Sequence, residues 1–177
     1  TVYSFDFSWS PDGKWFVVTL ISNMRDPYSD IGIVSASGDM KIHNITNDGY
    51  ITSDPSWVLD GNAIIFSSNR YGMRSHASWG SQDDAFIAFL NQESYDKFRL
   101  SKEDFELLEE EEKIMKSIAE KSEKDDKDSK DKDKKKDNKD DNEEKDKPIE
   151  VDLDRLDERI IRLTPMSSHL SGIELSK

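Results

Sequence analysis

Cysteine is absent from the 177 residues, which excludes disulfides and thiol chemistry but does not identify a compartment. Histidine is scarce: His43, His76 and His169 stand at spacings that fit no zinc motif. No GxSxG sequence marks a serine nucleophile. No apolar run approaches the roughly 20 residues that a membrane-spanning helix needs, so we expect no membrane span. The sequence therefore predicts no cofactor, no metal site and no catalytic residue in this chain.

Basic residues are also in deficit. The chain has 25 Lys and Arg against 38 Asp and Glu, a formal net charge of −13. We expect no nucleic-acid partner, because phosphate binding needs Lys and Arg clustered on one face. The opening TVYSFDFSWS has neither a basic region nor a long apolar region, so no signal peptide is predicted, and it does not begin with Met. We expect an internal fragment of a larger protein.

The charge is distributed unevenly along the chain. Residues 120–147 are almost entirely Lys, Asp and Glu, so a disordered, solvated linker is predicted over 120–148. The interleaved lysines and the lack of a DxDxDG loop argue against a calcium site there. Residues 99–119 are predicted to be helical, with Ser101 as N-cap and Asp104 in the capping-box position.

The first fifty residues read as short strands separated by turns. Tyr3–Trp9 alternates aromatic and polar residues, which is typical of a half-buried strand. Trp15–Ile21 is aromatic and β-branched, which predicts a well-buried strand after a PDGK turn. Asp30–Ser37 and Lys41–Thr46 are the third and fourth strands. Four such strands with turn signals between them indicate an all-β protein.

This pattern recurs along the chain. WSPDGKWFVV begins at Trp9 and WVLDGNAIIF begins 48 residues later, at Trp57. Three further pairs of segments align: Asp12-Gly13 with Asp60-Gly61, Asp30–Val34 with Asp84–Ala88, and Lys41–Thr46 with Arg159–Thr164. We interpret the repeated residues as structural. The tryptophans end a strand and fill the space between repeats, and each Asp-Gly pair makes a tight hairpin turn.

A repeat of this length with four strands indicates a β-propeller blade. One four-stranded blade has two faces and cannot cover both, so blades stack around an axis. The predicted fold is therefore all-β, with propeller blades interrupted by a helical, charged, low-complexity insertion. The predicted domains are the last blades of a first propeller, the helix, the linker and the first strands of a second propeller, over 1–98, 99–119, 120–148 and 149–177.

The repeats are similar to the TolB-like propeller repeat, on SWSPDGKWFVV and SWVLDGNAIIFSSNRYG. That repeat occurs in TolB-like periplasmic proteins, prolyl-oligopeptidase-type enzymes and tricorn-type peptidases. In this repeat family we expect Arg70, which follows SSN, to bond backbone or a carboxylate of a neighbouring blade, with Asp54 as a possible partner. The long Ser-rich loop Ser75–Asp84 is expected to line a pore or contact a neighbouring domain.

A second resemblance is more specific. SWGSQDDAFIAFLNQESYDKFRLSKEDFELLEE, followed after the charged run by VDLDRLDERIIRLTPMSSHL, resembles exported tricorn-type serine peptidases. The resemblance implies a non-catalytic propeller segment that acts as scaffold, gate or substrate filter for the proteolysis of peptides or unfolded chains. It implies catalytic residues outside this chain, a periplasmic or exported location, with a cytoplasmic location as the alternative, and a possible homo-oligomer. Two alternatives stay open: a TolB-like protein-binding propeller without activity, and the propeller lid of a prolyl-oligopeptidase-type enzyme.

Overall fold

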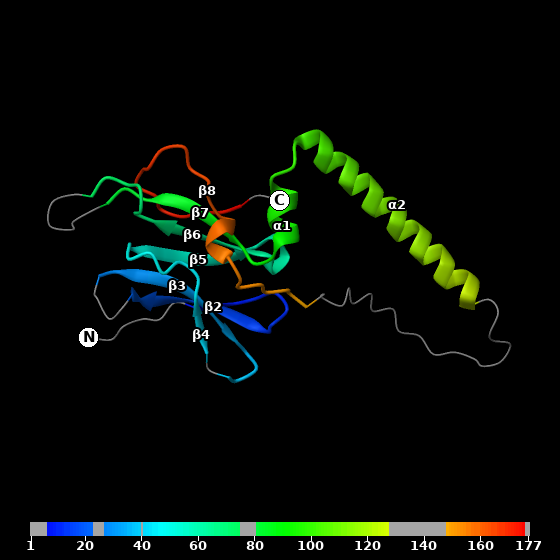
Figure 1. Cartoon of the computed structure of the whole chain (residues 1–177), viewed down its shortest axis with the longest axis horizontal. Coiled ribbons are helices and arrows are strands. Elements are labelled where there is room, and N and C mark those ends of the chain that lie inside the picture. The colour runs from blue at the N-terminus through cyan, green and yellow to red at the C-terminus, as the bar shows by residue number, and fades with distance from the viewer. Residues whose placement is uncertain (1–6, 23–26, 40, 75–80, 128–147, 176–177) are drawn as a thin grey trace. The chain divides into compact units, whose positions relative to one another are not determined.

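The computed structural model describes residues 7–22, 27–39, 41–74, 81–127 and 148–175. They form two compact units, one with all the strands and one that begins at Asp96 and contains the long helix α2. The strands form two four-stranded antiparallel sheets in which sequence neighbours pair (Figure 1). The first sheet contains β1 (Phe7–Trp9), β2 (Trp15–Ile21), β3 (Ser29–Ser35) and β4 (Ile42–Asn44). The second contains β5 (Thr52–Val58), β6 (Ala63–Ser68), β7 (Asp84–Phe89) and β8 (Ile160–Arg162).

The two sheets share one register. In the first sheet Phe16 pairs with Val34, and the aligned residues of the second sheet, Ile64 and Ala88, also pair. The fourth strands follow the same rule, since Ile33 opposes His43 and Ile87 opposes Ile161. The repeat read from the sequence is therefore confirmed as a repeat of strand pairing, and the mostly β class is confirmed with it.

The main core lies between the sheets. Val17, Ile31 and Ile33 of the first sheet are completely buried and belong to one cluster with Ile64 and Phe66 of the second. The opposite face of the second sheet has its own buried cluster, which is covered by partly buried side chains from α1 and from the residues after β8. That cluster contains Ala63, Ile65, Ile87 and Phe89, with Tyr95, Leu163 and Ile173 packed on it. Every residue of β6 and β7 is buried as a result.

The first sheet, in contrast, is covered on one face only. In β2 only Val17 is buried, so the prediction of a well-buried strand over Trp15–Ile21 is wrong. Successive side chains of β2 point to opposite faces of the sheet. Phe16, Val18 and Leu20 lie on the face away from the core, in an open apolar groove of about 630 Å³. Trp9 lies in this groove with 55% of its surface exposed.

The charged insertion lies within the second sheet's own connectivity, between its third and fourth strands. It begins after β7 with α1 (Gln92–Phe98) and ends at η4 (Leu156–Arg159), directly before β8. The assignment of 149–177 to the first strands of a second propeller therefore needs correction, because β8 is the fourth strand of the second sheet. The aligned pair of segments KIHNIT and RIIRLT consists of two fourth strands.

The ends of the insertion are fixed to the sheet by hydrogen bonds. The Asp152 N–H donates to the Leu90 carbonyl oxygen at 2.8 Å. Arg159, which is 4% exposed, donates to the carbonyl oxygens of Phe89, Asp154 and Asp152. A buried guanidinium needs such acceptors, and here they hold the returning chain against the end of β7.

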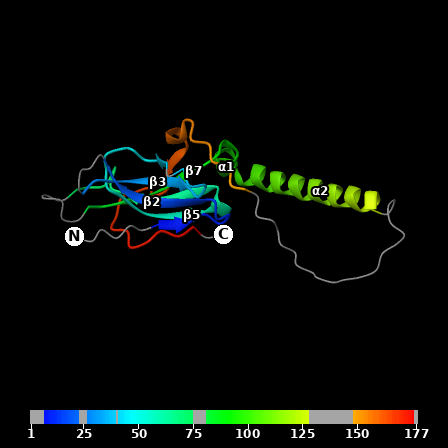
Figure 2. The same ribbon diagram turned by 90° about the horizontal axis from the view of Figure 1, so that it is seen from below.

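The helix of the insertion is longer than the sequence suggested. α2 runs over Lys102–Lys127 as one straight helix (Figure 2), so the first residues of the predicted linker 120–148 are helical. Residues 128–147 lie outside the described part of the chain. The predicted cap is confirmed, since the Asp104 N–H donates to Ser101 Oγ at 3.2 Å and Ser101 Oγ donates to Asp104 Oδ2 at 2.7 Å. Within the described ranges, no helix has the length and apolarity to cross a membrane.

Candidate functional site

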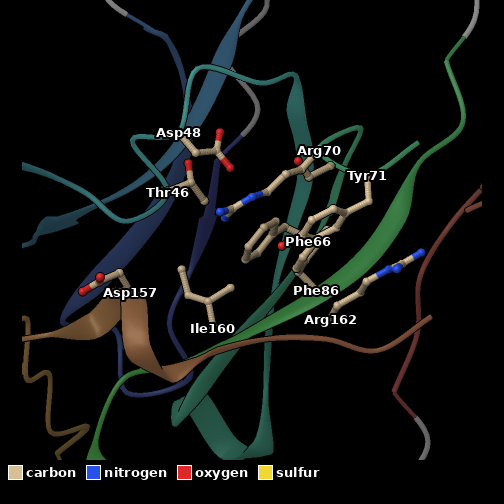
Figure 3. A pocket seen from close by; sticks show the side chains of 10 residues that line it. Thr46, Asp48, Phe66, Arg70, Tyr71, Phe86, Asp157, Ile160 and Arg162 are labelled. Atoms are coloured by element: carbon tan, nitrogen blue, oxygen red, sulfur yellow. The ribbon is translucent and has the colours of Figure 1, made fainter. Parts of the chain in front are cut away.

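A small pocket of about 120 Å³ opens where the end of the first sheet meets the second sheet. Thr46 and Asp48 follow β4, Arg70 and Tyr71 follow β6, and Asp157 lies in η4. The remaining lining residues come from β6, β7 and β8: Phe66, Ser68, Phe86, Ile160 and Arg162. Polar groups of both signs therefore surround an apolar floor (Figure 3).

Three aromatic rings build the floor. Phe66 and Phe86 are cross-strand partners and stack with their ring centroids 5.6 Å apart, and Tyr71 stacks on Phe86 at 6.1 Å. Phe66 and Phe86 are almost completely buried, whereas Tyr71 is 57% exposed. The floor is thus buried at its base and open to solvent at its rim.

Arg70 provides the free cation of the pocket. Among the described residues its guanidinium makes no hydrogen bond or ion pair, and its Cζ lies 5.5 Å from the Tyr71 ring and 6.0 Å from the Tyr50 ring. Figure 3 shows the Arg70 side chain extended toward Asp48 and Thr46, above the aromatic floor. A guanidinium held by aromatic faces keeps its donors available for an incoming acceptor.

Asp48 faces the same cavity. Burial raises the pKa of its carboxyl above the ordinary value, and the nearby charge of Asp30 adds to this effect. The Tyr50 N–H and the charge of Arg70 act in the opposite direction but do not cancel the burial. The pocket therefore places the guanidinium of Arg70 beside the carboxyl of Asp48, an arrangement that suits polar groups of a peptide.

Below the pocket, each sheet has a buried aspartate at the start of its third strand. Asp84 is fully buried and accepts hydrogen bonds from Arg162 (2.8 Å), Thr164 (2.8 Å) and Ser167 (2.9 Å). These donors outweigh the effect of burial and hold the pKa of Asp84 below its ordinary value, with the charge of Arg162 contributing. Asp84 thus ties β7 to the chain that follows β8.

Asp30 has the same role in the first sheet. It is 1% exposed and accepts from Asn44 Nδ2 at 2.9 Å and from Thr46 Oγ1 at 3.3 Å. Asn44 and Arg162 are register equivalents, so the two sheets differ in having a neutral and a charged partner for the same aspartate. Sequence analysis aligned these segments without giving the aspartates a role. The repeated Asp, together with the repeated Thr after the fourth strand, was the available signal.

The repeat tryptophans are placed differently by their sheets. Trp57 packs between the sheets, and its Nε1 donates to the Ser8 carbonyl oxygen at 3.0 Å. Trp9 is its aligned equivalent but lies on the open face. Neither these tryptophans nor the Asp-Gly pairs line the pocket, whereas Arg70 does. Asp54 Oδ2 accepts from the hydroxyls of Ser53 and Ser67, and no ion pair joins it to Arg70 among the described residues.

Both Asp-Gly pairs lie in turns, as expected, and both meet the returning insertion. Gly13 and Gly61 have φ of +67° and +89°. Asp12 Oδ2 accepts from the Ile149 N–H at 2.9 Å, and the Ile149 side chain occupies the space beside Gly61 that a Cβ would need. Asp60 lies in the turn η2 (Leu59–Gly61) with φ +54°.

Histidine chemistry gains no support within the described ranges. His43 lies in β4 and His169 follows Ser168, which bridges to Asp83. No group of three or more potential metal ligands occurs among the residues that the structure describes. His76 and most of the Ser75–Asp84 loop lie outside them.

The fold has a counterpart among solved structures. The fold resembles part of the tricorn protease. A crystal structure of that protein matches with a TM-score of 0.51 and 11% sequence identity, over 92% of this chain and 13% of the other. The chain thus spans about an eighth of the protein it matches, and at this identity the likeness is one of fold. No family model matches the sequence, and no curated protein does.

Proposed function

We propose that this chain is a non-catalytic β-propeller segment of a tricorn-type serine peptidase, where it acts as scaffold and substrate filter. The observation that carries the proposal is that the two sheets stack head to tail, so that their equivalent faces point the same way instead of toward each other. The Ile64 and Phe66 face of the second sheet packs on the first, and the aligned residues of the first sheet, Phe16 and Val18, face the open groove. The open face of the first sheet could therefore pack on a further sheet, in the same way as the second sheet packs on the face that contains Val17 and Ile33.

Head-to-tail stacking of this kind supports a ring rather than a two-sheet sandwich. In a closed sandwich the outer faces are polar, because only the inner faces are buried. Here Phe7, Trp9 and Ile42 on the outer face are all more than half exposed. Blades stacked around an axis would bury them, as the likeness to the tricorn protease implies.

The pocket would give this segment its contact with substrate. Arg70 offers donors that no described residue pairs with, above an aromatic floor, which suits the carbonyl and carboxylate groups of a peptide or an unfolded chain. Hydrolysis itself would be performed by a serine nucleophile outside these residues. An exported location and assembly into a homo-oligomer are part of the same proposal, and nucleic acid is not a partner in it.

A charge introduced at the open face tests the stacking. Trp9→Lys should cost less than about 1 kcal/mol in the 177-residue chain, because Trp9 is 55% exposed there. In the parent protein it should cost roughly 2–3 kcal/mol, since about 100 Å² of further apolar surface would be buried, at about 25 cal/mol per Å². Urea unfolding measures both values.

Trp57→Lys is the matched control, because Trp57 already lies between two sheets. It should destabilise the short chain and the parent protein alike. An equally small cost of Trp9→Lys in both proteins would contradict the propeller.

The filter function is tested on the parent protein. Arg70→Ala should lower kcat/KM for long peptides more than for short ones, and a fluorophosphonate should label the parent protein but not the 177-residue chain. If the parent protein shows neither labelling nor peptidase activity, a protein-binding propeller of the TolB type replaces the proposal.

A further inference from the structure

The helix α2 exposes an apolar stripe that it does not need for its own formation. Leu107, Ile114 and Ile118 are 59%, 58% and 56% exposed, and Met115 beside them is 68% exposed. Their spacing places Leu107, Ile114 and Ile118 on one face of the helix. We call these three residues the α2 stripe. No residue of α2 whose burial the structure describes is buried.

Local interactions account for the helix itself. Ser101 caps its first turn, and Glu103 and Asp104 lie in that turn, where carboxylates favour the helix dipole. Lys113 pairs with Glu109 one turn away at 3.4 Å, and Lys97 of α1 pairs with Glu112 at 2.9 Å. Polar contacts thus stabilise the helix, and the apolar stripe takes no part in them, so it is available to bind a partner.

The charge around the stripe selects its occupant. Residues 102–112 contain seven carboxylates and one lysine. Glu111 lies on the face of the stripe, one turn from Leu107 and less than a turn from Ile114. A second copy of this helix lying parallel to it would bring these carboxylates together across the contact, which costs free energy. An antiparallel copy would set them against residues 113–127, which contain five lysines but also four carboxylates, whereas a helix rich in lysines or arginines would neutralise them without opposing acids.

We propose that the α2 stripe and its acidic flank bind a basic amphipathic helix of a partner protein. Such a helix would lay leucine-like side chains along Leu107, Ile114 and Ile118 and place cations against Glu111 and its neighbours. The interaction is independent of the pocket and of the peptidase proposal, because it uses only residues of the insertion.

The probe is a synthetic amphipathic helix of leucine and lysine, measured by fluorescence anisotropy against the 177-residue chain. A peptide of the same composition with scrambled order is the first control, since it has the same charge but no apolar face. The ordered peptide should bind at least about tenfold more tightly than the scrambled one. Leu107→Ser with Ile114→Ser should abolish that difference while circular dichroism shows the helix retained.

Two glutamates of the same helix give the matched pair. Glu111→Gln should weaken binding several-fold, whereas Glu109→Gln, on the opposite face and beside Lys113, should leave it unchanged. Equal effects of the two substitutions, or equal affinity for the ordered and scrambled peptides, would show that binding depends only on the net negative charge of the helix. Either result would overturn the proposal. Self-association through the stripe, seen as a dimer that Ile114→Ser dissolves, would overturn it as well.

Discussion

Replacing the buried Asp84 by asparagine should destabilise the two-sheet unit far more than the same replacement at Asp30. Asp84 is fully buried and accepts from Arg162, Thr164 and Ser167. The substitution Asp84→Asn would keep the size of the side chain but remove the counter-charge of Arg162. Loss of one member of a buried ion pair costs about 3–5 kcal/mol. Because the Arg162 side chain is 32% exposed and keeps some access to water, we expect a value near 3 kcal/mol.

Asp30→Asn provides the internal comparison. Its donors are the neutral side chains of Asn44 and Thr46 and one backbone N–H of Asp48, so no cation loses its partner. Weakened hydrogen bonds to a buried group cost roughly 1–1.5 kcal/mol. Loss of the Asp30 charge also removes its repulsion of the Asp48 carboxylate, which helps to raise the pKa of Asp48. The two variants should therefore differ by at least about 1.5 kcal/mol.

Urea unfolding followed by tryptophan fluorescence measures both variants, because Trp57 lies between the sheets. The pKa of Asp84 is lowered in the folded chain, so its stabilising contribution is present above the ordinary aspartate pKa and is lost as pH falls through the lowered value. The difference in unfolding free energy between the wild-type chain and Asp84→Asn should therefore become smaller in acid. Equal costs of the two substitutions at neutral pH would refute the account of Arg162 as the deciding partner.

Two further predictions concern the insertion. Gly61→Ala should cost more than Gly13→Ala, because both glycines have positive φ but only the Gly61 Cβ would meet other residues, lying 2.9 Å from Ile149 Cγ1 and 3.1 Å from Pro11 Cδ. The added Ile149→Ala change should reduce the difference in urea midpoints. Replacing residues 96–147 with a short Gly/Ser linker should change the unfolding free energy of the sheets by less than about 1 kcal/mol, since the loop ends are already held by Leu90 and Asp152. Loss of cooperative unfolding in this shortened chain would show that the insertion is part of the core.

Local patterns in the sequence determined the strands and their turns. Alternating aromatics, β-branched runs and Asp-Gly turns are local signals, and they located β2 and both hairpins because backbone preference and side-chain period act over a few residues. The alignment of the repeats agrees with the register of the strands, since Phe16 pairs with Val34 and the aligned Ile64 pairs with Ala88. The Ser101 cap was readable for the same reason.

Contacts between distant residues decided the rest. The aligned tryptophans Trp9 and Trp57 have similar local sequences, yet only Trp57 lies between two sheets. The partnership of Asp84 with Arg162 joins residues on either side of the insertion, and no local pattern encodes it. The place of residues 149–177 has the same cause. β8 pairs with β7 across the whole insertion, and no local pattern in the sequence identifies the strand with which a distant segment pairs.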